Sequence, residues 1–213
     1  GQIKGLYPEG VRELVDGGTF DTIAGQPTDD SEMALMLARS IIERGGYDPN
    51  GASEAYVYWY HSHPFDCGTT TSNGLSGRPD HGSQANGAMM RICPLGIFGA
   101  NHGVEKVGRW AREDAAHTHP NPVCLQANTL YTIAIAHAIR TGPKPEDLYN
   151  QVVSWARDMK VEPPLMDAIT GAAGSPPKDF MQSQGWVLIA FRNALYRLLH
   201  AESLEEGVTG TVM

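Results

Sequence analysis

Thr28, Asp29 and Asp30 place a hydroxyl and two carboxylates side by side, directly before an apolar run, in GQPTDDSEMALMLARSII (residues 25–42). One interpretation is an ordinary helix start, in which Asp29 or Thr28 caps the helix, Glu32 completes a capping box and the acidic turn complements the helix dipole. The other is a cation site, because hydroxyl and carboxylate oxygens suit Mg²⁺ and Mn²⁺. A cap needs only one such oxygen, so the cluster of three keeps the metal hypothesis open.

Two near-identical segments, HSHP (residues 61–64) and HTHP (residues 117–120), carry paired histidines. Imidazole is a good zinc ligand, so one hypothesis is a zinc hydrolase that uses the four histidines at 61, 63, 117 and 119. The alternative is that each pair marks a helix end, since histidine suits the C-terminal dipole and proline stops a helix. We favour the helix end for the first pair.

Three further polar positions have simple structural interpretations. Asp66 precedes Gly68 in a loop-like stretch, where an Asx turn is the plainest expectation. The Asn86-Gly87 pair, taken alone, is simply typical of a turn. Arg91 suits either a phosphate partner or a structural ion pair.

Apolar residues recur at helical spacing through most of the chain. Met33, Leu37 and Ile41 recur every four residues and predict a mostly buried helix over residues 30–44, ending at Gly45-Gly46. The same pattern predicts helices in the segments 104–116, 122–140, 145–159 and 184–204. The aromatic segment EAYVYWYHSHP favours a strand by propensity, but no strand partner lies nearby, so we expect a helix. The predicted fold class is all-α.

The last of these segments has a clear apolar face. Its residues are Val187, Phe191, Leu195, Leu198 and Leu199, whereas Arg192, Asn193 and Arg197 lie largely elsewhere.

Residues 67–87 and 160–180 are rich in Gly, Pro, Ser and Thr and are predicted as long functional or mobile loops.

Composition narrows the class of protein. A chain of 213 residues with 41% hydrophobic and 19% charged residues is typical of a globular protein, and without an interdomain linker we expect a single domain over residues 1–213. The net charge of -8 argues against nucleic-acid binding. No bilayer-length apolar run or signal peptide is visible. Three cysteines without a C-x-x-C pair favour a reducing compartment, so we expect a cytoplasmic protein without membrane partners.

Four segments follow one another along the chain in the order GQPTDDSEMALMLARSI, DCGTTT, SQANGAMMRICPLGIF and HTHPNPVCLQANTLY. In this order they resemble the ADP-ribosylglycohydrolase family, which includes the dinitrogenase reductase-activating glycohydrolases, and GWVLIAFRNALYRLLHAES resembles a later core helix of that family. The resemblance implies a compact orthogonal multi-helix fold with a pair of Mg²⁺ or Mn²⁺ ions in a central cleft. It also implies removal of ADP-ribose from modified arginine or, in some branches, from other acceptors.

Position by position, the resemblance assigns roles to the polar residues. The metal ligands are Thr28, Asp29 and Asp30; the catalytic residues are Asp66 and Asp30; and the substrate-binding residues are Asn86, Gly87, Ala88, Met89 and His119. His119 is expected to form hydrogen bonds with the substrate rather than to bind metal. The implied chemistry is hydrolysis of an N- or O-glycosidic bond through an oxocarbenium-like state.

The chain departs from the family pattern at both ends. It contains neither the N-terminal helix with a Gly-Asp-rich motif and a functional glutamate nor the C-terminal Gly-Gly-Asp-x-Asp-Thr segment, so we expect a domain truncated at both ends. Three explanations stay open: a fragment of a complete enzyme, ligands supplied by another chain, or a relative that binds ADP-ribose without hydrolysis. The expected partner is ADP-ribose or an ADP-ribosylated protein, with arginine as the expected acceptor.

Overall fold

The computed structural model describes residues 5–8, 10–178 and 180–212. Its assigned helices are α2 (Asp29–Arg44), α3 (Pro49–His61), α4 (Thr69–Leu75), α5 (Gly87–Arg91), α6 (Cys93–Gly99), α7 (Val104–Ala116), α8 (Pro122–Thr141), α9 (Pro145–Asp158), α10 (Pro163–Gly171), α11 (Phe180–Ser183), α12 (Val187–His200) and α13 (Leu204–Val212). Between these helices, the described segments contain isolated β-bridges but no β-strand. The all-α prediction is therefore confirmed.

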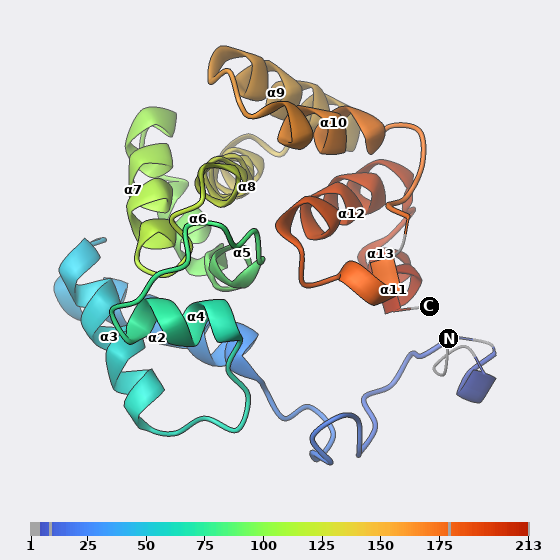
Figure 1. Ribbon diagram of the computed structural model, residues 1–213. Helices are drawn as coiled ribbons and strands as arrows, with labels where there is room; N and C mark the ends of the chain where they lie inside the picture. The colour runs from blue at the N-terminus through green and yellow to red at the C-terminus, as the bar shows by residue number, and fades with distance from the viewer. Residues whose placement is uncertain (1–4, 9, 179, 213) are drawn as a thin grey trace.

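Helix α8 lies at the centre of the fold and packs against α6, α7, α9 and α12 (Figure 1). It is apolar around most of its circumference, because both of its sides are covered by other helices. One core cluster joins α8 to α9, α10 and α12, and a second joins α2, α3 and α6. No helix among the described residues is both long and apolar enough to span a membrane.

The predicted helix over residues 30–44 is α2, with one additional residue at its start. Met33 and Leu37 are fully buried and Ile41 nearly so, and Gly45 ends the helix in the left-handed conformation that glycine adopts easily. The aromatic segment forms α3, as expected, with Tyr56 buried in the second core cluster.

Two predicted loops are wrong in part, because each contains a helix. Residues 160–180 include α10, whose Leu165, Ala168 and Ile169 are spaced for one buried face. The proline pair at its start is a helix-initiating signal, since a first-turn proline loses no hydrogen bond. Residues 67–87 include α4, a short helix of poor helix formers that packs against α3 and α5. Its local preference is overridden by tertiary packing.

Candidate functional site

The acidic start of α2 is held against the loop at residues 66–68. Asp29 is 7% exposed, and its Oδ2 accepts a hydrogen bond of 3.2 Å from the Gly68 backbone N–H. Thr28 is the N-cap residue, but its side chain forms no capping hydrogen bond to the backbone; Thr28 Oγ1 instead donates to Asp30 Oδ2 over 3.4 Å. The side-chain oxygens around the first turn thus form hydrogen bonds with the neighbouring loop and with one another.

The capping-box prediction for this helix is wrong. The carboxylate of Glu32 accepts a hydrogen bond of 2.8 Å from Trp59 Nε1 on α3, so it joins two helices rather than closing the turn. The local sequence pattern is compatible with both partners, and the packing of α2 against α3 selects the indole.

The start of α2 and the neighbouring loop place three carboxylates near one another, those of Asp29, Asp30 and Asp66. Burial, followed by the nearby charge of Asp29, raises the pKa of Asp30 above its ordinary value. Burial and then the charges of Asp29 and Asp30 also raise the pKa of Asp66. Among the described residues, no ion pair includes any of these three carboxylates. The loop and the helix start therefore form an acidic cluster, Asp29–Asp30–Asp66, that would be stabilised by a cation.

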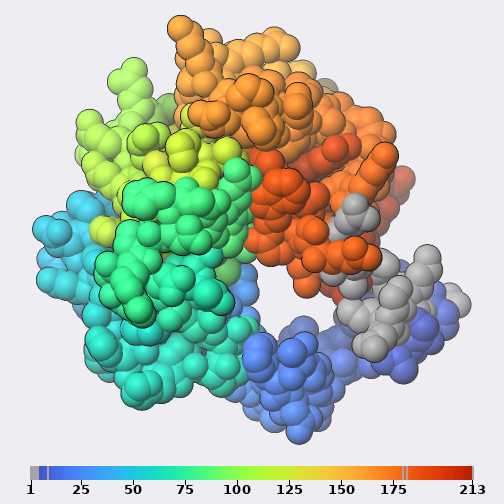
Figure 2. Space-filling model, viewed as in Figure 1, coloured from blue at the N-terminus to red at the C-terminus, as the bar shows by residue number. Residues whose placement is uncertain are grey.

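A cavity of about 770 Å³ opens beside the acidic cluster. In Figure 2 the surface is hollowed where the blue N-terminal, green central and orange C-terminal parts of the chain approach one another. The residues that line the cavity are Asp29, Asp30, Gly68, Thr69, Thr70, Thr71, Ala85, Asn86, Gly87, Met90, His119, Phe180, Gln184, Gly185, Ala190, Asn193 and Thr211.

The central wall of the cavity is formed by two chain segments about one hundred residues apart in sequence. The backbone N–H of Asn86 donates to the Gly185 carbonyl over 2.9 Å, and Asn86 Nδ2 donates to the Gln184 carbonyl over 3.1 Å. The backbone N–H of Val187 donates to the Gln84 carbonyl over 2.8 Å. These bonds hold the start of α5 beside the start of α12 and so fix the position of Asn86 and Gly87.

His119 reaches the cavity from the end of α7. Its side chain is fully buried, its Nδ1 lies 2.8 Å from Thr118 Oγ1, and its Nε2 has no hydrogen-bond partner among the described residues. Burial, followed by the charge of Arg91, lowers the pKa of His119 to about 3. The imidazole is therefore neutral at physiological pH.

The structure places the remaining predicted substrate residues differently. Ala88 and Met89 are buried in apolar clusters and do not line the cavity. Arg91 is also fully buried and pairs with Asp114 over 3.2 Å, so the structural ion pair is the correct one of its two interpretations. Asp66 does not line the cavity, although it belongs to the acidic cluster at its edge.

The four histidines of the zinc hypothesis do not share a site. His61 and His63 lie exposed at the end of α3, whereas His119 is buried beside the cavity. Within the described part of the chain, no three His, Cys, Asp or Glu side chains are arranged to hold a metal ion by themselves, and this includes Asp29, Asp30 and Asp66.

Thr28, Asp29 and Asp30 fit a hard divalent cation as part of its ligand set. Their oxygens are of the kind that Mg²⁺ and Mn²⁺ prefer, and no ion pair among the described residues includes Asp29 or Asp30. Two carboxylates and one hydroxyl supply fewer than the roughly six oxygens of a complete shell. The other ligands would have to be water, substrate or further protein groups.

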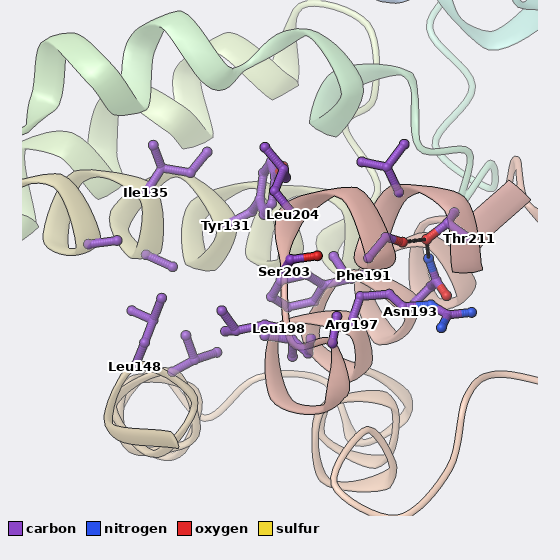
Figure 3. A pocket seen from close by; sticks show the side chains of 18 of the residues that line it. Tyr131, Ile135, Leu148, Phe191, Asn193, Arg197, Leu198, Ser203, Leu204 and Thr211 are labelled. Atoms are coloured by element: carbon purple, nitrogen blue, oxygen red, sulfur yellow. Dashed lines mark hydrogen bonds between the residues drawn. The ribbon is translucent and has the colours of Figure 1, made fainter. Parts of the chain in front are cut away.

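Asn193 is a cavity residue that the sequence interpretation placed elsewhere. It is 7% exposed, and its Nδ2 donates to Thr211 Oγ1 on α13 over 3.1 Å. Both residues also border a second cavity of about 760 Å³, which is lined mainly by apolar side chains of α8, α12 and α13 (Figure 3). The sequence signal that could have identified this residue is an asparagine within an otherwise apolar helix. When such a side chain is buried, it needs a polar partner.

These features define an all-helical protein with a carboxylate-edged cavity. The sequence profile of the ADP-ribosylglycohydrolase family matches residues 1–213, and the chain therefore belongs to that family. The resemblance noted from the sequence is thus confirmed.

The chain is similar to several known proteins. It is 25% identical over 217 residues to the ADP-ribosylarginine hydrolase Tri1 of Pseudomonas putida (strain GB-1), covering 94% of this chain and 57% of that protein. It is 29% identical over 163 residues to the ADP-ribosyl-[dinitrogen reductase] glycohydrolase of Rhodospirillum rubrum, covering 71% of this chain and 55% of that protein. A solved structure titled "ADP-ribosylglycohydrolase-related protein complex" matches with a TM-score of 0.80 and 27% identity, covering 93% of this chain and 68% of the other. The chain spans about half the length of the curated relatives it matches.

Proposed function

We propose that the 770 Å³ cavity binds ADP-ribose and that this chain carries the ligand-binding part of a metal-dependent ADP-ribosyl hydrolase. The proposal rests on one observation: polar residues from separate parts of the chain meet at the same cavity. Asp29–Asp30, Asn86–Gly87 and His119 come from three separate segments, and all of them line one cavity. The names of the curated relatives support the same chemistry, because both are hydrolases of ADP-ribosylated targets.

The cation in this proposal is Mg²⁺ or Mn²⁺, held by Thr28, Asp29 and Asp30, with a second ion in a complete site. When bound, such ions polarise substrate oxygens and activate water for attack on the anomeric carbon. Asp29 is oriented for this role by its hydrogen bond from the Gly68 N–H. The pKa of Asp30 is raised by burial and by Asp29, so a cation would stabilise its ionised form.

The proposed substrate is ADP-ribosylated arginine. Asp66 stands in the acidic cluster, and a carboxylate there is suited to orient the departing guanidinium through charge-assisted hydrogen bonds. One of the relatives is named an ADP-ribosylarginine hydrolase, which supports arginine over other acceptors.

The test is release of ADP-ribose from an ADP-ribosylated arginine peptide. The assay uses the longest natural form of the protein, with Mg²⁺ or Mn²⁺ in excess. Asp29→Asn should reduce the rate by at least about a hundredfold, because it removes a carboxylate ligand. Asp167→Asn makes the same chemical change at an exposed position of α10, away from the cavity, and should retain the rate.

The assay also separates hydrolysis from binding alone. Absence of ADP-ribose release from arginine, serine or other acceptors in the presence of either metal would contradict the hydrolase proposal. If the same sample still bound ADP-ribose, the protein would be a non-catalytic ADP-ribose-binding relative.

A further inference from the structure

The Thr118 hydroxyl lies between two buried polar side chains. Arg91 Nη1 donates to Thr118 Oγ1 over 2.8 Å, and the same oxygen lies 2.8 Å from His119 Nδ1. All three side chains are fully buried. The chain of contacts thus leads from the core of the protein to a residue that lines the cavity.

Arg91 is held firmly enough to direct this contact. Its Nε and Nη2 donate to Asp114 Oδ1 over 3.3 and 3.2 Å, and Nη2 also donates to the Asp114 carbonyl over 3.1 Å. Tyr56 donates its hydroxyl to Asp114 Oδ2 over 2.8 Å, and its ring lies 4.3 Å from Arg91 Cζ. With these groups satisfied, Nη1 is the part of the guanidinium that faces Thr118.

The direction of the bonds follows from the chemistry of arginine. A guanidinium only donates, so Thr118 Oγ1 accepts from Arg91. The hydroxyl proton of Thr118 then has no acceptor among the described residues other than His119 Nδ1. Nε2 has no partner among the described residues in either tautomer, so the Thr118 proton decides between them: if Nδ1 carried the ring proton, the Thr118 proton would also be buried without an acceptor, which is unfavourable. Nδ1 is therefore the acceptor, and the proton of the neutral ring lies on Nε2.

The Nε2 side of the ring faces the region where a ligand is expected. Nε2 is buried without a partner, and the backbone of Gly87, another cavity residue, is close to it. Burial and the charge of Arg91 lower the pKa of His119 and so oppose a second ring proton. A buried donor without a partner is a group that a ligand atom would satisfy.

We propose that Arg91 and Thr118 are positioning residues that fix His119 as the Nε2–H tautomer and direct this N–H toward an oxygen atom of the bound ligand. The identity of that ligand as ADP-ribose, with its hydroxyl, ring and phosphate oxygens, rests on the proposed function. The fixed tautomer has a consequence for the reaction. A neutral imidazole whose Nε2 is protonated offers no lone pair to the ligand, so His119 orients the ligand and does not act as a base.

The tautomer can be measured without ligand by NMR. Long-range ¹H–¹⁵N correlation spectra of histidine-labelled protein distinguish protonated from unprotonated ring nitrogens, and His119→Gln identifies the signals of His119. We expect protonated Nε2 and unprotonated Nδ1 throughout pH 5–8. A protonated Nδ1 at pH 7, whether alone or together with Nε2, would overturn the inference.

Two variants test the role of the hydroxyl. Thr118→Val removes it at similar volume and should replace the single tautomer by a mixture, with ADP-ribose affinity lower by roughly tenfold for one lost hydrogen bond. Thr118→Ser keeps the hydroxyl and should restore both the spectrum and the affinity. An unchanged spectrum in a folded Thr118→Val variant would contradict the role of Thr118. If that variant does not fold, the spectra of the natural protein and Thr118→Ser still decide the tautomer.

The same samples keep this inference separate from the proposed function. The ring tautomer is recorded in the absence of ligand, whereas ADP-ribose affinity is measured by titration. A natural protein with protonated Nε2 that failed to bind ADP-ribose would contradict the proposed function but support the fixed tautomer. Tight ADP-ribose binding by a protein with protonated Nδ1 would support the function and refute the inference.

Discussion

Gly87 lies directly against the imidazole ring of His119. A Cβ atom built on Gly87 would stand 2.8 Å from His119 Cε1, 2.9 Å from His119 Nε2 and 2.8 Å from Thr71 Oγ1. No side chain can occupy that space unless the ring or Thr71 moves, and both are almost fully buried. The absence of a side chain at position 87 thus allows His119 to reach the cavity.

Gly87→Ala should therefore disturb the site and the fold together. We expect a loss of about 1–3 kcal/mol in the free energy of unfolding, typical of overpacking, measured by urea denaturation. ADP-ribose affinity should fall because the ring is displaced. Gly174→Ala is the matched control, since a Cβ there meets nothing within 4 Å, and its stability should stay within about 0.5 kcal/mol of the natural protein. Equal stability of the two variants would contradict the close contact.

We expect substitutions at Arg91 and Asp114 to have coupled effects on the free energy of unfolding, because the two side chains form a buried ion pair. Arg91→Met leaves the carboxylate of Asp114 buried without its partner, and we expect destabilisation by about 3–5 kcal/mol. Asp114→Leu should be comparably harmful, whereas the double variant should be more stable than the sum of the two losses predicts. A double-mutant cycle in urea measures this coupling. Strictly additive losses would show that the two residues do not depend on each other.

The crowded carboxylates predict a pH-dependent stability. The pKa of Asp30 is raised in the folded protein, so the folded state binds more protons than the unfolded state near that pKa. The carboxylate therefore costs stability at pH 7, and this cost disappears as the pH falls through the raised pKa toward the ordinary value of 3.8. Asp30→Asn should stabilise the metal-free protein at pH 7 by less than about 1 kcal/mol, since the surroundings of Asp30 desolvate its carboxylate only in part and the remaining solvent contact screens its charge.

Thermal unfolding at several pH values checks this expectation. The advantage of the asparagine variant should shrink on acidification, and excess Mg²⁺ should stabilise the natural protein more than the variant, because a ligand of the folded state raises its stability. A variant that is less stable than the natural metal-free protein at pH 7 would mean that the Asp30 carboxylate contributes favourable contacts instead.

Helix periodicity was sufficient to predict most of the long helices. Met33, Leu37 and Ile41 define a single buried face, and neighbouring helices cover that face as the spacing indicates. The short helices α4 and α13 were missed because their Gly- and Thr-rich sequences have weak helical preference. The predicted helix over residues 184–204 also extends too far, since α12 ends at His200.

Residue chemistry alone indicated the site only where a motif is local, whereas the assignment of Asn86, Gly87 and His119 came from the resemblance to the family. Asp29 and Asp30 are neighbours in the chain, so their chemistry is visible at once. The position of His119 beside Gly87 depends on how α5 packs against the end of α7, and no local pattern contains that information. Asn193 was assigned outside the apolar face of its helix, yet it is buried, because α13 covers it and accepts its hydrogen bond.

The central claim is that this cavity binds ADP-ribose with the help of a divalent cation. Its most direct test is a calorimetric titration of the 213-residue chain with ADP-ribose, with and without Mg²⁺, alongside Asp29→Ala. The account predicts binding that Mg²⁺ strengthens and that Asp29→Ala abolishes. A folded natural chain that takes up no ADP-ribose in either condition would contradict it.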